Sequence, residues 1–510
     1  MTVVPAPERH VLIAVDVETG APRHLDITSL HSLVRETAAR VRDRVPGLRP
    51  GTLLAIALRN SVQSVVLQLA AEELGLVPFP MAPRGDHAAM RDAARASGAV
   101  ALAHVVLGHA PRVEIEEIEE SIGTAVRADK AAGRPGQTSG TFSDWGLAIG
   151  TSGSTGSAKT VVLGREALDR NSRAFADRTG LGPLARYVVT APMWHVGGSV
   201  VGMRAAFSSG ALLILPPEAK PAVLAAWIER YRPTHLAAVP TVLFDLHNWG
   251  AEWSANASWP QQIITGGMAV EKSLVGSLHT LGSRVTVLYG MTEFTNAVMS
   301  AQANPGVVLP TGFVGNPFPG VTCRIEPEPS SSGEHEPYGR LLVRGYPRAA
   351  AVVQEGTVRP LPVDADGWYE TGDLARQTAD GYVIVGRSRD VAIRGGVNIS
   401  GGTLTDAARR TLLAKEAAVQ VLPSKRLGED IALIVHGPSD EECRRRQQDF
   451  LAQLPHGTRP GYLIVSRCPL PRTANDKYDL AGMYQQTTAL VEAAGAQTSG
   501  IPIFSVDKWS

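Results

Sequence analysis

The sequence lacks the features that mark several broad classes of protein. Its three cysteines are too few for a disulfide framework, and none of them forms a Cys-x-x-Cys pair of the kind that holds zinc. The 49 basic residues balance the 49 acidic ones, so the chain has no overall charge with which to hold nucleic acid. A membrane helix needs about 18 consecutive apolar residues. The best candidate, 199–216, is interrupted by Arg204 and a Ser-Ser-Gly turn.

The first residues also lack the pattern of a signal peptide. The early apolar run at 11–15 is short and is followed by Asp16. The low cysteine content fits a reducing compartment. We therefore expect a cytoplasmic protein whose partners include neither nucleic acid nor a membrane, and the oligomeric state stays open.

Short apolar runs alternate with helix-like stretches along much of the chain. Four of these runs lie at 53–58, 187–191, 235–239 and 285–289. Such alternation predicts an α/β fold in which buried strands are linked by crossover helices. The segment 222–231 has helical spacing and leads directly into one of these runs, so it is predicted to be a crossover helix.

The pattern changes after Tyr369, where short strands and turns replace the longer elements. A chain of 510 residues is also longer than the roughly 150 residues of a typical domain. We place a boundary at Gly386. Residues 1–386 are then predicted to form a large domain with mixed or parallel sheets, and residues 387–510 a small, mobile α+β domain.

A loop rich in glycine and hydroxyl residues follows the apolar run at 145–150. It reads TSGSTGSAK over residues 151–159, and its amides and hydroxyls are suited to surround phosphate oxygens, with positive charge from Lys159. A Walker-type phosphate loop requires Gly-Lys-Ser/Thr, whereas Ala158 precedes the lysine here. A flexible loop would have the same composition, so the assignment depends on the other motifs.

Those motifs lie further along the chain. ITGGMAV at 264–270 puts two glycines after a strand, and VLYGMTEF at 287–294 puts a hydroxyl beside the carboxylate of Glu293. Mg²⁺ prefers oxygen ligands shared between carboxylates and substrate phosphates, so Glu293 is a candidate magnesium ligand. YETGDL offers Asp373 as an acceptor for ribose hydroxyls, and PRTANDK presents Lys477 on a turn-rich segment.

In this order the segments resemble the adenylate-forming superfamily of acyl- and aryl-CoA synthetases, luciferases, peptide-synthetase adenylation domains and amide bond synthetases. The similarity extends from about Leu53 to about Leu480. Its motifs are TSGSTGSAK, PMWHVGG, VPT, TGGM, YGMTE, VGNPFPG, YETGD, GRSRD, IRGG and PRTANDK. The resemblance implies ATP and Mg²⁺ as cofactors and a small C-terminal domain that rotates.

The resemblance also implies a role for each motif residue. Lys477, Thr292, Glu293 and His195 would be catalytic, with Glu293 holding Mg²⁺ and Arg389 at the hinge. The predicted nucleotide site comprises Thr151, Ser152, Gly153, Ser154, Thr155, Gly156, Lys159, Gly266, Gly267, Met268, Tyr289, Gly290, Met291, Thr292, Asp373 and Arg387. The predicted acid pocket comprises His195, Val196, Gly197, Gly198, Val239, Gly266 and Gly290. This small or apolar lining favours an apolar or aromatic carboxylic acid. For His195 the alternative stays open, because a lone histidine after a strand is about as often a core residue.

The implied reaction forms an acyl-adenylate and pyrophosphate from a carboxylic acid and ATP, after which a second nucleophile takes the acyl group. CoA ligases usually continue from the Gly-Gly loop into Pro-x-Glu-x-Glu, and here Gly401, Thr403 and Thr405 stand in those places. This departure favours an amine acceptor, with His195 as a candidate base. CoA is the alternative, a carrier protein a third. A nucleotide-binding homologue without catalysis is a minor alternative, because Lys477 and Glu293 are both present.

Overall fold

The computed structural model describes the chain in sixteen segments. These are 10–83, 86–106, 112–118, 144–152, 158–249, 258–268, 270, 272–327, 338–354, 357–387, 391–394, 397–424, 428–454, 458–472, 478–493 and 501–509. The chain forms two compact units. The first unit comprises 1–322 and 344–364, and the second comprises 323–343 and 365–510.

A mixed sheet lies at the centre of the first unit, in the order β15, β14, β13, β12, β11, β9, β10, β1, β2. From β13 to β1 the neighbouring strands are parallel, and the pairs at both ends are antiparallel. The strands are β1 (His10–Val15), β2 (Pro22–Asp26), β9 (Arg186–Val189), β10 (Leu212–Leu215), β11 (His235–Ala237), β12 (Gln262–Gly266), β13 (Arg284–Tyr289), β14 (Met299–Ala303) and β15 (Phe313–Pro317). The predicted α/β pattern is therefore confirmed.

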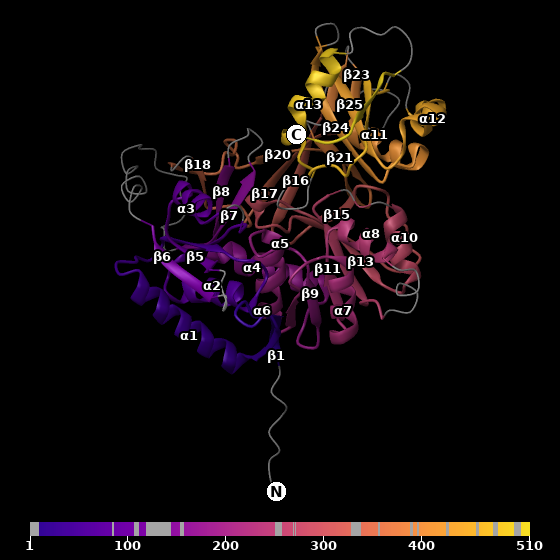
Figure 1. Ribbon diagram of the computed structural model, residues 1–510. Coiled ribbons are helices and arrows are strands. Elements are labelled where there is room, and N and C mark those ends of the chain that lie inside the picture. Colours follow the sequence, from indigo (N-terminus) through magenta and orange to yellow (C-terminus); the bar gives the residue numbers. More distant parts are fainter. Residues whose placement is uncertain are drawn as a thin grey trace. The chain divides into compact units, whose positions relative to one another are not determined.

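Helices connect the parallel strands of this sheet. The predicted crossover at 222–231 is α7 (Pro221–Tyr231), which begins with proline at its first turn and ends at Arg232 in the left-handed conformation. Leu224 and Ile228 on this helix are buried. Figure 1 shows α7 near β9 and β11, with α8 (Pro240–Asn248) and α10 (Lys272–Thr280) close by.

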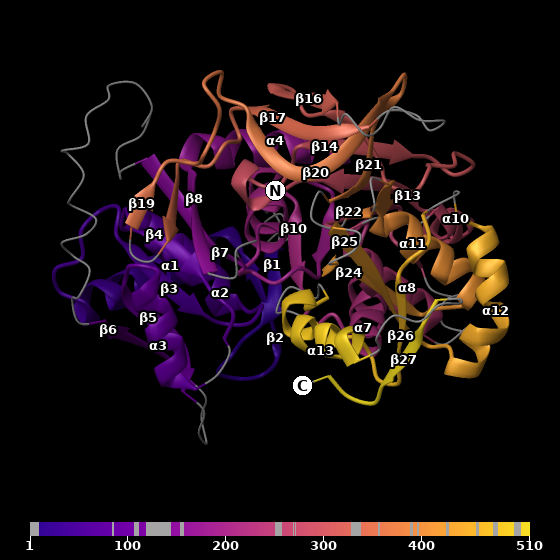
Figure 2. The ribbon, with the colours of Figure 1, turned by 90° about the horizontal axis from the view of Figure 1, so that it is seen from above.

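Two smaller sheets complete the first unit. One has the order β4, β3, β5, β6 and the other β19, β18, β8, β7. Figure 2 shows α1, α2 and α3 around the first of them. The elements are α1 (Ile27–Arg44), β3 (Leu53–Ala57), α2 (Val62–Glu73), β4 (Val77–Pro80), α3 (His87–Ala96), β5 (Ala99–Val106), β6 (Arg112–Glu117), β7 (Trp145–Ser152), β8 (Ala158–Gly164), α4 (Arg165–Thr179), α5 (Val196–Gly198), α6 (Ala205–Ser209), β18 (Ala351–Gln354) and β19 (Thr357–Arg359). A π-helical turn, η3 (Ser199–Arg204), joins α5 to α6.

The second unit has two groups of strands. The first has the order β16, β17, β20, β21, and the second has the order β23, β22, β25, β26, β27, with β24 also on β25. The elements are β16 (Val321–Pro327), β17 (Gly339–Gly345), β20 (Tyr369–Thr378), β21 (Gly381–Arg387), β22 (Val391–Arg394), β23 (Val397–Ser400), α11 (Gly401–Ala407), β24 (Glu416–Ser424), β25 (Gly428–His436), α12 (Asp440–Ala452), β26 (Tyr462–Ser466), α13 (Leu480–Ala493) and β27 (Ile503–Val506).

Gly386 lies near the end of β21 and is paired with Leu374. A division by compactness does not locate a hinge, so the boundary at Gly386 stays a prediction. None of the helices in the described segments has both the length and the apolar character needed to cross a membrane.

Candidate active site

The clearest contact between predicted site residues is an ion pair. Nζ of Lys159, on β8, lies 2.6 Å from Oε1 of Glu293, although the two residues are 134 positions apart in the sequence. Their side chains are only 24% and 13% exposed. Because the surroundings screen these charges less than bulk water does, each stabilises the other. The structure thus joins the predicted phosphate-binding lysine to the predicted magnesium ligand.

A short 3₁₀ turn holds Thr292 and Glu293. This turn, η4 (Thr292–Phe294), follows β13 and ends at Thr295 in the left-handed conformation. The N–H of Asn296 donates to the carbonyl of Met291 at 2.9 Å and closes the turn. Gly290 is required here, because a Cβ at this position would lie 1.1 Å from the carbonyl oxygen of Asn296. The sequence YGMTE is therefore a tight turn that carries Thr292, which is buried, and Glu293.

The backbone around Glu293 is fixed by a segment that sequence analysis missed. The N–H of Ala349 donates to the carbonyl of Glu293 at 2.8 Å, and the next residue, Ala350, donates to Val162 on β8 at 2.8 Å. The hydroxyl of Thr295 donates to the carbonyl of Pro347 at 2.6 Å. These bonds place η4 beside β8 and so align the Lys159–Glu293 pair. Backbone contacts of this kind depend on no residue type, so the sequence offers no signal for them.

The predicted phosphate loop joins two antiparallel strands. Thr151 on β7 pairs with Lys159 on β8, and Ser152 pairs with Ala158. The hydroxyl of Thr151 donates to the carbonyl of Lys159 at 3.4 Å. A Walker loop leads from a strand into a helix, so this hairpin connection agrees with the exclusion of that motif. Gly153, Ser154, Thr155 and Gly156 lie outside the described residues.

Residues predicted for the acid pocket and the adenine site follow four adjacent parallel strands. Gly290 follows β13, Gly266 ends β12, Val239 follows β11 and His195 follows β9. These strands are neighbours in the sheet, in that order. Their carboxyl ends meet at one edge, which is where α/β sheets usually bind ligands. The structure therefore brings these residues to one edge of the sheet.

The glycines at this edge differ in their surroundings. A Cβ on Gly266 would lie 2.0 Å from the carbonyl oxygen of Leu288 on β13, so this glycine is required by strand packing. Gly267 has φ +80° and no atom within 4 Å of a Cβ built on it. It is exposed, while Met268 and Tyr289 are half-buried. Gly267 therefore leaves the loop surface open beside two larger side chains.

His195 occupies the N-cap of the short helix α5. Its Nδ1 accepts a hydrogen bond of 3.0 Å from the N–H of Gly197, and its own N–H donates to the carbonyl of Pro192 at 3.0 Å. A Cβ on Gly198 would lie 2.3 Å from that same carbonyl oxygen, so the turn needs glycine. In a neutral imidazole whose Nδ1 accepts, Nε2 carries the proton. The ring is thus set to donate through Nε2.

Asn60 anchors the segment that leads to His195, and sequence analysis missed it. Its Nδ2 donates to the carbonyl of Ala191 at 3.1 Å, and its Oδ1 accepts from the N–H of Met193 at 2.9 Å. Asn60 is buried. In the sequence Asn60 follows the apolar run at 53–58 after a single residue, Arg59, and this place does not reveal its partners.

In the second unit, the two residues predicted to bind ribose are backbone register partners in a strand pair. Asp373 on β20 is the register partner of Arg387 on β21. Asp373 is 7% exposed, and its N–H donates to the hydroxyl of Thr371 at 3.0 Å. Lys477 and Arg389 lie outside the described residues. The ribose-binding roles of Asp373 and Arg387 stay predictions.

Comparison with known proteins identifies similar sequences and folds. The sequence pattern of the AMP-binding enzyme family matches residues 4–351. An indoleacetate–CoA ligase from Aromatoleum aromaticum is 29% identical over 334 residues, which cover 64% of this chain and 64% of the relative. The putative acyl-CoA synthetase YngI from Bacillus subtilis is 27% identical over 286 residues, which cover 55% of this chain and 52% of the relative.

Among solved structures, the amide bond synthetase McbA from Marinactinospora thermotolerans has a TM-score of 0.69 and 21% identity, covering 93% of this chain and 97% of that one. At this identity the likeness is one of fold. The chain spans only about half to two thirds of the length of the first curated relatives it matches. The superfamily predicted from the motif order is nevertheless confirmed by the family match.

Proposed function

The chain belongs to the AMP-binding enzyme family, and from this premise we propose that it is an ATP-dependent carboxylic acid ligase acting in the cytoplasm. It forms an acyl-adenylate and pyrophosphate. The amine nitrogen then attacks the acyl carbon, the bond from that carbon to the phosphate oxygen breaks, AMP leaves, and the amine loses a proton to give the amide. Its substrates are small molecules, namely an apolar or aromatic acid and an amine. The bond that breaks first is that between the α-phosphorus of ATP and its bridging oxygen, and the acid carboxylate forms the new bond to phosphorus.

The ion pair between Lys159 and Glu293 is the observation that carries this proposal. Its ammonium and carboxylate groups, 2.6 Å apart, are the two charges that a magnesium–triphosphate substrate requires. Lys159 binds the β- and γ-phosphates. Glu293 would hold Mg²⁺, which prefers oxygen ligands and which, when bound, supplies positive charge to the phosphates. The hydroxyl of the adjacent Thr292 would contact the α-phosphate. When the substrate binds, the ion pair between Lys159 and Glu293 would be replaced by a contact of Lys159 with the phosphates and a contact of Glu293 with Mg²⁺.

The edge formed by the loops after β9, β11, β12 and β13 supports an acid pocket next to these charges. Glu293 follows β13 directly, on the turn that begins at Gly290. The predicted lining at this edge is small or apolar, with no carboxylate to receive an amino group. These properties favour an apolar or aromatic acid, and one relative is named for an aromatic acid, indoleacetate.

We assign His195 a positioning role at this edge. Its Nδ1 is occupied by the N–H of Gly197, so the neutral ring presents a donor and would act as a base only after this bond breaks. The amine must then enter the reaction as its free base. We expect the rate of amide formation to rise with pH up to the pKa of the amine. The inflection of this pH profile should shift when the amine is changed. A profile that keeps one inflection near about pH 6.5 for every amine, the ordinary value for histidine, would instead identify His195 as the base.

Gly401, Thr403 and Thr405 support an amine as the acceptor. They lie on α11, where the hydroxyl of Thr405 donates to the carbonyl of Gly402 at 3.0 Å. CoA ligases of the superfamily usually have Pro-x-Glu-x-Glu at this place. The segment lacks the proline and both glutamates of that pattern. Transfer to CoA is the second candidate, because curated relatives are named as CoA ligases. A nucleotide-binding homologue without catalysis is the minor alternative.

One experiment separates these functions. The protein is incubated with ATP, Mg²⁺ and a panel of aryl carboxylic acids, and pyrophosphate exchange is measured before mass spectrometry of reactions that contain either an amine or CoA. We expect exchange with at least one acid and an amide as the main product. Saturable acyl-CoA formation without any amide would establish the CoA ligase. Absence of exchange with every acid, despite ATP binding, would support the non-catalytic homologue.

A further inference from the structure

We propose that His87, His104 and Glu116 form a binding site for a divalent transition-metal ion, with Zn²⁺ as the first candidate. The three side chains come from α3, β5 and β6, and none of them belongs to a segment that carries the predicted nucleotide or acid site. Their ligand atoms all lie within 4.8 Å of one another. The inference is independent of the proposed ligase function.

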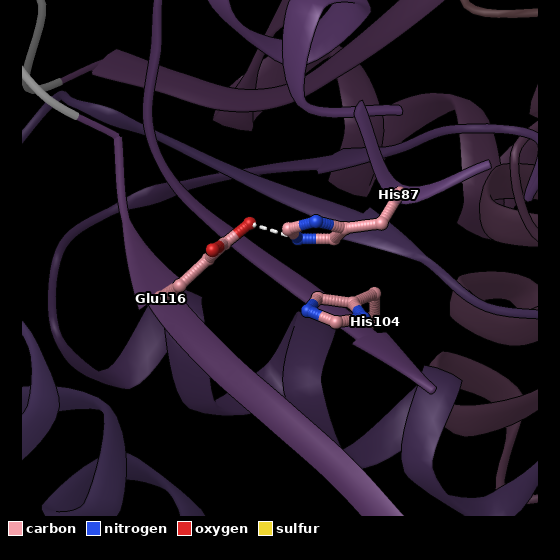
Figure 3. Close-up of side chains that lie close together, drawn as sticks. All are labelled: His87, His104 and Glu116. Atoms are coloured by element: carbon pink, nitrogen blue, oxygen red, sulfur yellow. Dashed lines mark hydrogen bonds and ion pairs between the residues drawn. The ribbon is translucent and has the colours of Figure 1, made fainter. Parts of the chain in front are cut away.

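The geometry follows from the packing of α3 on the sheet of β4, β3, β5 and β6. His104 on β5 is the register partner of Glu114 on β6, and Glu116 lies two positions further along β6, on the same face as Glu114. His87 is the first residue of α3, whose N-cap is Asp86. Figure 3 shows the two imidazole rings one above the other, with the carboxylate of Glu116 directed at His87. Three separate elements thus direct ligand atoms at one position.

The distances suit a site that closes around a metal ion. Nε2 of His87 is 2.6 Å from Oε1 of Glu116, and the two ring centroids are 4.5 Å apart with 43° between the ring planes. With metal–ligand bonds of about 2.0–2.1 Å, the ligand atoms of a tetrahedral site lie roughly 3.3 Å apart. On metal binding, the distance between the ligand atoms of His87 and Glu116 would therefore increase slightly. The other distances between ligand atoms would decrease by at most about 1.5 Å.

The burial of the three side chains allows that movement. His104 is 7% exposed and fixed in the sheet, while the side chains of Glu116 and His87 are 26% and 47% exposed. The most exposed ligand therefore lies at the end of a helix and can rotate, and the most buried one cannot. The exposure of His87 and Glu116 would allow a water molecule to act as a fourth ligand.

The chemistry of the set favours zinc over magnesium or calcium. Two imidazoles and one carboxylate are a ligand set that Zn²⁺ uses, whereas Mg²⁺ and Ca²⁺ prefer oxygen ligands. Within the described residues, the ring nitrogens of the buried His104 make no hydrogen bond, and its neighbour is the ring of His87. A metal bond would give this imidazole the polar partner that the described residues do not supply.

A metal at this position would also explain how α3 is held. Ala94 is the buried residue of this helix, and Met90 packs partly against the same core cluster, so its apolar contact with the sheet is small. The competing interpretation is a simple ion pair between Glu116 and a protonated His87, with His104 stacked beneath. That arrangement would bind no metal, and replacement of His104 would not affect the ion pair.

The test uses the untagged full chain, stripped of metal by a chelator and dialysed. Calorimetric titration with Zn²⁺ alone is expected to show one site per chain, and titration with Co²⁺ alone to give the visible absorption of a tetrahedral complex. Glu116→Gln and His87→Ala should each weaken Zn²⁺ binding by more than tenfold, as loss of metal-site residues typically does. His31→Ala, which removes an exposed histidine from α1, is the matched control and should bind as the wild type does.

Two further readouts keep the proposal falsifiable. Melting of each variant without metal shows whether it is folded, and Zn²⁺ should raise the Tm of the wild type and of His31→Ala but not of Glu116→Gln. Pyrophosphate exchange should be unchanged in Glu116→Gln. Absence of a Zn²⁺ site in the wild type, or equal affinity in all four proteins, would overturn the proposal in favour of the ion pair.

Discussion

Lys159→Ala should lower the stability of the protein more than Glu293→Gln does, whereas Glu293→Gln should lower its activity more than Lys159→Ala does. Lys159→Ala leaves the carboxylate of Glu293 without its cation at a position where the side chain is 13% exposed. Loss of one partner of a fully buried ion pair costs about 3–5 kcal/mol. Because this pair retains some contact with water, we expect a smaller loss of about 1–3 kcal/mol in the free energy of unfolding.

Glu293→Gln should cost less stability, about 1 kcal/mol, because the amide oxygen still accepts a hydrogen bond from Lys159 and only the charge is lost. It should cost more activity, since the predicted magnesium ligand is removed. Loss of a group that stabilises developing charge typically lowers turnover by about 10²-fold or more. The double variant, Lys159→Ala with Glu293→Gln, contains no unpaired charge. Its stability loss should fall short of the sum of the single losses by about 1–2 kcal/mol.

The assay combines calorimetric melting with pyrophosphate exchange for the four proteins. Lys220→Ala is the control, because Lys220 pairs with Glu218 at 2.8 Å while its side chain is 74% exposed. An exposed pair contributes about 0–1 kcal/mol, so this variant should resemble the wild type in both measurements. Strictly additive stability losses, or normal exchange by Lys159→Ala, would refute the role assigned to the pair.

Three further predictions follow from the described contacts. Asp373→Ala should weaken ATP binding by about 1.5–3 kcal/mol, the range for charge-assisted hydrogen bonds, and calorimetry that finds equal affinity would count against the ribose role. Gly290→Ala should not fold correctly, because its Cβ would meet the carbonyl oxygen of Asn296 at 1.1 Å; a soluble variant with wild-type Tm would contradict this. Burial raises the pKa of Cys323 to about 12 and that of Cys443 to about 11, and nearby acidic groups add to the second shift. Because thiolates are the reactive form, only the half-buried Cys468 should react quickly with a thiol reagent at pH 8 in the folded protein, and rapid labelling of all three would refute it.

Local pattern was sufficient to predict several elements of the large sheet. The helix predicted at 222–231 is α7, and the apolar run at 285–289 falls within β13 (Arg284–Tyr289). Both depend on signals within a few residues, namely helical periodicity, a proline at the helix start and an apolar run. The pairing of β18 with β8 joins Ala351 to Val162. No local pattern specifies such a distant partner, because it is decided by the packing of the whole unit.

The candidate site likewise contains some residues that local motifs reveal and others that only the fold reveals. Charged residues such as Lys159, Glu293 and Asp373 could be named as candidates from motifs, because a charged group suggests its chemistry in any sequence. Asn60 and Ala349 could not, since they act by bonding to backbone groups of other segments. The ion pair itself was also not foreseen, because it depends on where β8 lies relative to η4.

The motif glycines show how structure redistributes the roles that a sequence suggests. Gly198, Gly266 and Gly290 each face a backbone carbonyl oxygen so closely that a Cβ would lie within 2.3 Å of it. Their presence is therefore explained by the approach of two backbone segments, whether or not a ligand binds. Gly267 has no such neighbour, and its exposed backbone at φ +80° has no packing explanation. This positive φ by itself favours glycine, and the open space beside Gly267 is compatible with the predicted contact with a flat base. By this argument, Gly198, Gly266 and Gly290 fix the shape of the loops at the carboxyl edge, whereas Gly267 is the motif glycine whose predicted contact with substrate is not already explained by a close backbone approach.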